Sequence, residues 1–151
     1  MRLPENSRRR VDVDYVAEEQ WVGYADGFPL LVISQTSVDF LSAQLGRKFE
    51  LERFRPNVVI AGAEQEFEER DWQSLNLHLG GEIQLVKPCE RCVIPTRGLV
   101  TQERELDALD VMKKYCRIDS KIIFGQNAIL TGANELKVGQ KVDAGYCNDD
   151  D

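Results

Sequence analysis

Short apolar stretches with strand-like spacing recur along the chain. Leu30 to Ile33 form a continuous apolar run behind a turn at residues 26–29, which is typical of a buried strand. Apolar and polar residues alternate in 75–79 and again in 83–87, on either side of Gly80-Gly81, which predicts a β-hairpin. Further extended segments are predicted at 49–54, 58–60, 122–130 and 136–142, the first two joined across Pro56.

Two segments show helical spacing instead. Residues 34–45 can be capped by Thr36 or Ser37, and Gly46 follows as a stop. Residues 105–116 form the second predicted helix, whose apolar stripe is far more typical of core than of a cofactor site. That stripe comprises Leu106, Leu109, Met112 and Tyr115 or Cys116.

The order of these elements indicates a mainly β fold. About seven short strands with one or two short helices do not alternate regularly, which favours a closed or nearly closed β-barrel over an α/β sheet. Residues 1–22 are polar and weakly periodic, and we expect a flexible lead-in there. Residues 23–143 are expected to fold as one domain, followed by a disordered acidic tail at 144–151.

Composition and charge limit the domain number, the location and the partners that we expect. A chain of 151 residues fits one domain, and its 42% hydrophobic content includes no apolar run of the roughly 20 residues that span a bilayer. No secretory signal is recognisable, so we expect a cytoplasmic protein without a membrane partner. A net charge of -7 repels phosphate backbones, which disfavours nucleic-acid binding. The acidic run at 64–69 is interpreted as a solvated loop or helical turn without chemistry.

The cysteines are the first candidates for chemistry. Four cysteines without a secretion signal indicate reduced thiols rather than a disulfide framework. Cys89 and Cys92 lie three apart with Arg91 between them, and a nearby cation favours the thiolate that binds soft metals. The pair alone is compatible with half of a zinc site, a redox pair or two buried thiols. Zinc lacks a second ligand pair in this chain, and the segment after Cys92 looks extended rather than helical, which weakens the redox interpretation.

Two further spots suit an anionic ligand. Arg55 beside Pro56 offers a fixed, two-pronged donor for phosphate if the backbone is extended, and Asn57 would lie on the same side of that strand. The alternative is a surface arginine that covers apolar area with its stem. In residues 124–127, the glycine either lets the backbone approach a ligand or marks a strand bulge.

These spots occur together in one known family. Four sequence blocks, in this order and followed by a Val-Gly strand, closely resemble the MOSC domain, named for the C-terminal part of molybdenum cofactor sulfurase. The resemblance covers about residues 23–142 and is strongest to the bacterial and mitochondrial reductases of N-hydroxylated compounds, the amidoxime reducing component type. The blocks are Asp26-Gly27-Phe28-Pro29-Leu30-Leu31, Arg53-Phe54-Arg55-Pro56-Asn57, Lys87-Pro88-Cys89-Glu90-Arg91-Cys92 and Phe124-Gly125-Gln126-Asn127.

The resemblance implies a β-barrel that holds molybdenum-molybdopterin. Cys92 matches the cysteine that binds molybdenum and is the implied metal ligand and catalytic residue, whereas Cys89 would be a neighbour only. The implied cofactor-binding residues are Gly27, Phe28, Arg55, Asn57, Glu90, Arg91 and Asn127.

The chain departs from the family at both ends. Such reductases usually carry an N-terminal β-barrel that supplies part of the cofactor pocket, and the residues before Gly23 are too few to form it. Many bacterial relatives continue into a 2Fe-2S ferredoxin domain, whereas this chain stops at Asp151. The electron donor is therefore expected to be a separate protein of ferredoxin or flavoprotein type.

Three functions remain open from the sequence. The favoured one is a molybdenum-dependent oxidoreductase that removes oxygen from a small N-hydroxylated compound. The second is a sulfur carrier that holds a persulfide on Cys92. A cysteine desulfurase or a pyridoxal-phosphate partner domain would supply the sulfur, because this chain has no recognisable pyridoxal-phosphate lysine motif of its own. The third is a module that binds a pterin or a partner without turnover.

Overall fold

The computed structural model describes residues 9–10, 21–22, 30–92, 96–133 and 136–146. Its contacts divide the chain into two compact units. The first comprises Met1–Leu31, Asp71–Lys87 and Gln126–Asp151, and the second comprises Val32–Arg70 and Pro88–Gly125. Within the described part, no helix is long and apolar enough to cross a membrane.

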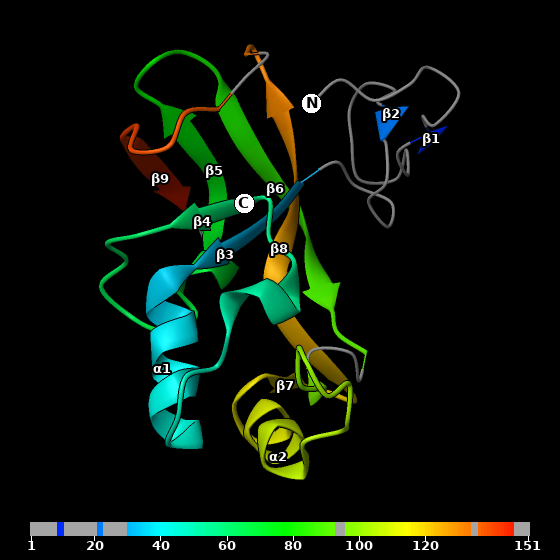
Figure 1. The fold of residues 1–151 in the computed structure, drawn as a ribbon. Coiled ribbons are helices and arrows are strands. Elements are labelled where there is room, and N and C mark those ends of the chain that lie inside the picture. Colours follow the sequence, from blue (N-terminus) through cyan, green and yellow to red (C-terminus); the bar gives the residue numbers. More distant parts are fainter. Residues whose placement is uncertain (1–8, 11–20, 23–29, 93–95, 134–135, 147–151) are drawn as a thin grey trace. The chain divides into compact units, whose positions relative to one another are not determined.

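Seven strands form one sheet, in the order β4-β3-β8-β6-β5-β9, with β7 paired to β8 (Figure 1). Together with two α-helices in the described part, they confirm the mainly β prediction. A separate pair of two-residue strands, β1 (Arg9–Arg10) and β2 (Trp21–Val22), lies in the predicted lead-in. The strands of the sheet are β3 (Leu30–Ser34), β4 (Val58–Ile60), β5 (Trp72–Leu77), β6 (Glu82–Glu90), β7 (Arg117–Ile118), β8 (Lys121–Thr131) and β9 (Val142–Tyr146).

The first unit contains the predicted hairpin. β5 pairs antiparallel with β6, with Leu75 opposite Ile83, and on its other side with β9. The strand predicted at 136–142 is wrong, because residues 138–139 form a turn with Gly139 at φ 86 and β9 begins only at Val142. β9 extends to Tyr146, three residues into the predicted tail. The buried apolar residues here are Trp72, Leu75, Leu77, Ile83, Ala128 and Ile129.

The second unit contains both helices, α1 (Gln35–Leu45) and α2 (Leu106–Tyr115). Both helix predictions are confirmed, and Gly46 ends α1 in a left-handed conformation, as a glycine readily does. The expected cap is wrong, since Ser34 takes the N-cap position. Leu106 is 66% exposed, so the predicted stripe of α2 buries only its later residues. The helices meet where the rings of Phe40 and Tyr115 lie 5.1 Å apart.

An aromatic cluster fills the core of the second unit. The ring of Phe54 lies 5.1 Å from Phe49 and 4.6 Å from Phe124, and all three residues are at most 1% exposed. Such offset and tilted ring pairs contribute beyond the area that they bury. The carbonyl groups of Phe54 and Phe124 are therefore attached to residues that have little freedom to move.

The segment before Pro56 is helical rather than extended, so the strand predicted at 49–54 is wrong. Residues Leu51–Phe54 form a turn of 3₁₀ helix, η2. A second such turn, η3 (Glu68–Arg70), follows the acidic run. That run is not wholly solvated, because Glu69 is 1% exposed.

Candidate cofactor site

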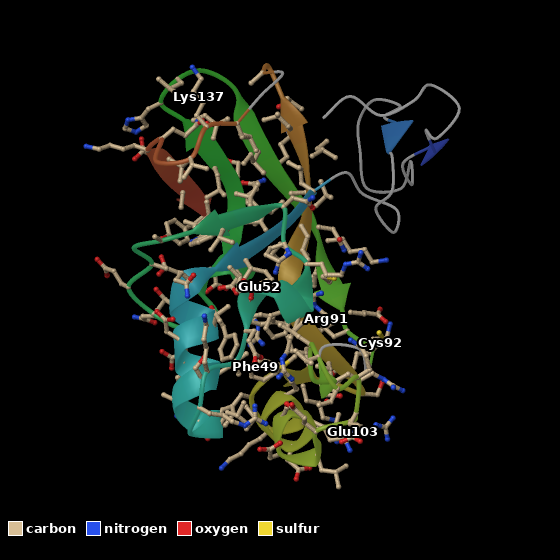
Figure 2. All side chains as sticks on the ribbon, in the orientation of Figure 1. Phe49, Glu52, Arg91, Cys92, Glu103 and Lys137 are labelled. Carbon is tan, nitrogen blue, oxygen red and sulfur yellow. The ribbon has the colours of Figure 1, made fainter. Side chains whose placement is uncertain are left out.

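Cys92 lies just beyond the end of β6 and is exposed. The backbone N–H of Arg91 donates to the carbonyl of Ile122 at 2.7 Å, so the pairing with β8 continues one residue past the strand. Burial alternates here, with Cys89 and Arg91 half-buried and Glu90 and Cys92 exposed. Figure 2 labels both neighbouring side chains, with Arg91 on the side of Phe49 and Cys92 farther out. The Cys92 thiol is thus accessible to a bound metal or cofactor.

The other described thiols are less suited to that role. Cys116 is fully buried, and burial raises the pKa of its thiol to about 12, so it stays protonated and inert. Cys89 is half-buried, and its thiol donates to the carbonyl of Glu90 at 3.7 Å. Three residues of extended chain span about 10 Å, whereas a disulfide needs Cα atoms within about 7 Å. The alternation through Arg91 therefore disfavours a Cys89–Cys92 redox pair.

Arg91 is tied to the protein by its own guanidinium. Its Nε donates to the carbonyl of Phe124 at 2.8 Å, and its Nη1 donates to the carbonyl of Phe54 at 3.0 Å. Its Nη2 is buried and has no partner among the described residues. Burial lowers the pKa of the Arg91 guanidinium, and the nearby sulfur atoms of Cys89, Cys92 and Cys116 act in the opposite direction. An arginine remains cationic despite such a shift.

Arg55 has an unusual backbone conformation. It follows η2 as the C-cap residue with φ 54 and ψ 50, in the left-handed region, and its N–H donates to the carbonyl of Glu52 at 3.2 Å. The predicted extended backbone at Arg55 is therefore wrong. The side chain is exposed. Strain of this kind in a residue other than glycine is often retained for function.

The remaining predicted residues fall in different places. Asn57 is exposed directly before β4, and the Glu90 carboxylate accepts a hydrogen bond from Lys121 Nζ at 2.6 Å. Asn127 is half-buried on β8, in the first unit. Gly27 and Phe28 lie outside the described residues. The structure thus brings the Arg55 and Cys92 blocks and Phe124 together around Arg91.

Sequence reasoning missed the buried Arg53, which lies in the η2 turn directly before Phe54 and Arg55. The side chain of Arg53 is 2% exposed and donates to Glu105 through Nη1 at 2.7 Å and through Nη2 at 3.3 Å. Glu50 also pairs with Arg53, and the N–H of Glu105 donates to the carbonyl of Thr96 at 2.8 Å. Glu105 thus ties the η2 turn to the residues that lead from Cys92 into α2. The available signal was that Arg53 opens the Arg53-Phe54-Arg55-Pro56-Asn57 block of the family resemblance.

A glycine at position 55 separates the two roles of this residue. Glycine adopts a left-handed conformation without strain, so Arg55→Gly is expected to leave the free energy of unfolding unchanged or to raise it by up to about 1 kcal/mol. Arg55→Ala removes the same guanidinium but keeps the strain, and is expected to be less stable than Arg55→Gly. Urea unfolding of the two variants measures the difference, and equal stability would show that the conformation carries no strain.

Comparison with known proteins places this mainly β domain in a family. A model of the MOSC domain matches residues 19–143, and the chain belongs to the MOSC domain family. The mitochondrial amidoxime-reducing component 1 of Homo sapiens is 29% identical over 140 residues, covering 85% of this chain and 40% of that protein. The mitochondrial amidoxime reducing component 2 of Rattus norvegicus is 32% identical over 135 residues, covering 80% and 38%. The chain thus spans about 40% of the length of these relatives.

Solved structures are similar to this chain at a lower level. The YUAD protein from Bacillus subtilis has a TM-score of 0.49 and 8% sequence identity, covering 83% of this chain and 71% of that chain.

Proposed function

We propose that this chain is a domain that holds molybdenum-molybdopterin for an oxidoreductase acting on small N-hydroxylated compounds. Its family membership and the names of its relatives, which are amidoxime-reducing components, support this proposal. The structural observation that carries it is the exposed Cys92 thiol, which follows in sequence the half-buried Arg91 that is bound to the Phe54 carbonyl.

The residues present are chemically suited to this cofactor. The exposed thiol of Cys92 is a suitable soft ligand for a metal that a pterin already holds. The buried Nη2 of Arg91 has no partner within the described part of the chain, and such a group gains most from an anionic acceptor. In the proposed site, Cys92 would bind the metal, while Arg55 and the Nη2 of Arg91 would bind the phosphate or pterin, with Asn57 and Glu90 as further contacts.

When bound, the molybdenum would supply the two-electron chemistry that removes oxygen from the substrate. The chain's own task is to bind and orient. The strained turn fixes the Arg55 backbone, and the pairing of Arg91 with Ile122 fixes the backbone next to Cys92. The reducing electrons would come from a separate ferredoxin- or flavoprotein-type donor.

The test is the cofactor content of the full chain made in a host that synthesises molybdopterin. We expect stoichiometric molybdenum and pterin in the wild type and in Cys89→Ala, and at least a tenfold loss in Cys92→Ala. Cys89 is the matched control because it is the half-buried thiol three residues away. A wild type without metal, or a Cys92→Ala variant that loads normally, would contradict the proposal.

The exposure of Cys92 also keeps a second function open, a sulfur carrier. The Cys92 thiolate would attack the outer sulfur of a desulfurase persulfide, giving a Cys92 persulfide and releasing the desulfurase thiol. Mass spectrometry after incubation with a cysteine desulfurase and cysteine would detect one added sulfur atom on Cys92. Its absence would count against this function and leave the molybdenum proposal intact.

A further inference from the structure

We infer that Arg91 is a positioning residue, whose main task is to hold the Arg55 turn against the segment that carries Cys92. This inference rests on the proposed function of Arg55 and Cys92. It changes the role that the family resemblance implies for Arg91, because most of its guanidinium is occupied by the protein itself.

Three hydrogen bonds tie Arg91 to backbone carbonyls that are distant in sequence. Its N–H reaches Ile122 at 2.7 Å. Its Nε reaches Phe124 at 2.8 Å, across 33 residues, and its Nη1 reaches Phe54 at 3.0 Å, across 37 residues. A planar guanidinium can direct donors to two carbonyls at once, whereas the ammonium of lysine is a single flexible point.

The acceptors of these bonds are held firmly. The Arg91 Cζ lies 5.4 Å from the centre of the Phe54 ring, and that ring packs on the buried Phe124. Gly125 follows Phe124 with φ 82, a conformation that favours glycine. Movement of either carbonyl would disturb the aromatic core, so the guanidinium fixes one segment against the other.

The Phe54–Arg91 hydrogen bond lies one residue from each candidate cofactor ligand. Phe54 precedes Arg55, whose own N–H is bound to Glu52, and Cys92 follows Arg91. The Cys92 thiol and the Arg55 guanidinium are far apart in sequence. The Arg91 side chain nevertheless joins the two backbone segments that carry them. Such preorganisation raises affinity by removing the cost of ordering both groups when the cofactor binds.

The test is a double-mutant cycle on cofactor affinity, measured in the full chain by release of molybdopterin. Arg91→Lys is expected to weaken binding about tenfold. In the Arg55→Ala background the same change is expected to have at most a twofold effect, because Arg91 acts through Arg55. The control is Arg70→Lys, which removes a half-buried arginine that stacks on Phe67 in the same unit, and it should leave affinity within twofold.

The outcomes separate this inference from the proposed function. Additive effects of Arg91→Lys and Arg55→Ala would overturn the inference, because Arg91 would then act on the cofactor independently of Arg55. Normal affinity in Arg91→Lys, with loss in Cys92→Ala, would also overturn it and leave the proposed function standing. Equal loading of the wild type and Cys92→Ala would remove the proposed function.

A measurement on the wild type keeps the inference testable if Arg91→Lys does not fold. The Nε–H of Arg91, bound to the Phe124 carbonyl inside the unit, should give a separate, slowly exchanging NMR signal. A signal that exchanges as fast as that of the exposed Arg55 side chain would overturn the inference.

Discussion

Replacing Glu105 with glutamine is expected to lower the free energy of unfolding by about 2–3 kcal/mol. The Glu105 carboxylate accepts both Nη atoms of Arg53, whose side chain is 2% exposed. Glutamine keeps the shape but removes the charge and turns an amide donor toward the guanidinium. Arg53 would then be left buried with Glu50 as its remaining carboxylate partner. Urea unfolding followed by circular dichroism measures the change.

Asp107→Asn is the matched control for this prediction. Asp107 is 60% exposed and pairs with Arg47, which is itself 40% exposed. Exposed pairs contribute at most about 1 kcal/mol, and the loss of a charge in the first turn of α2 adds little to that. If both variants lost the same stability, burial of Arg53 would not be the cause of the Glu105 effect.

The same pair predicts a dependence on pH. The hydrogen bond from Arg53 is the main cause that lowers the pKa of Glu105 below its ordinary 4.5, and burial opposes it. A lowered pKa means that the unfolded chain binds the proton more tightly, so this contribution is complete above pH 4.5 and is lost as pH falls through the folded pKa. The stability gap between wild type and Glu105→Gln should therefore close in acid.

The parts of the fold that could be predicted are those whose signals are local. The spacing of Val38 and Leu41 together with Gly46 predicted α1, and alternation around Gly80-Gly81 predicted the β5–β6 hairpin. The turn before Pro56 was not predictable in this way. The two residues before its left-handed Arg55 are held by distant partners, since Arg91 donates to the Phe54 carbonyl and Glu105 accepts from Arg53. Arg91 and Glu105 come from the later segment of the second unit.

In the candidate site, too, some features could be predicted from the sequence and others could not. The exposed position of Cys92 agrees with its proposed role as a ligand. The partners of Arg91, in contrast, are the carbonyls of Phe54 and Phe124, and a carbonyl is present in every residue, so no sequence pattern marks it. Burial of Glu69 was missed because acidic runs are usually solvated.

Glu69→Gln is expected to raise the free energy of unfolding by about 1–2 kcal/mol near neutral pH. Glu69 Oε2 accepts from Ser37 Oγ at 2.7 Å, but Oε1 is buried without a partner among the described residues. Burial is the main cause that raises the pKa of this carboxyl, with Ser37 and Arg70 opposing it. A glutamine carbonyl can accept the same Ser37 bond, so the substitution removes the buried charge and keeps this hydrogen bond.

The sign of the pH dependence distinguishes this carboxyl from Glu105. A raised pKa means that the folded chain binds the proton more tightly, so the wild type loses stability as pH rises from 4.5 to the folded pKa. The advantage of Glu69→Gln should therefore be smallest in acid and grow toward neutral pH. The exposed Glu66→Gln, which lies three residues earlier, should change stability by less than about 0.5 kcal/mol at any pH. An advantage of Glu69→Gln that shrank as pH rose would mean that the Glu69 charge is stabilised in the core, by Arg70 or by bound water.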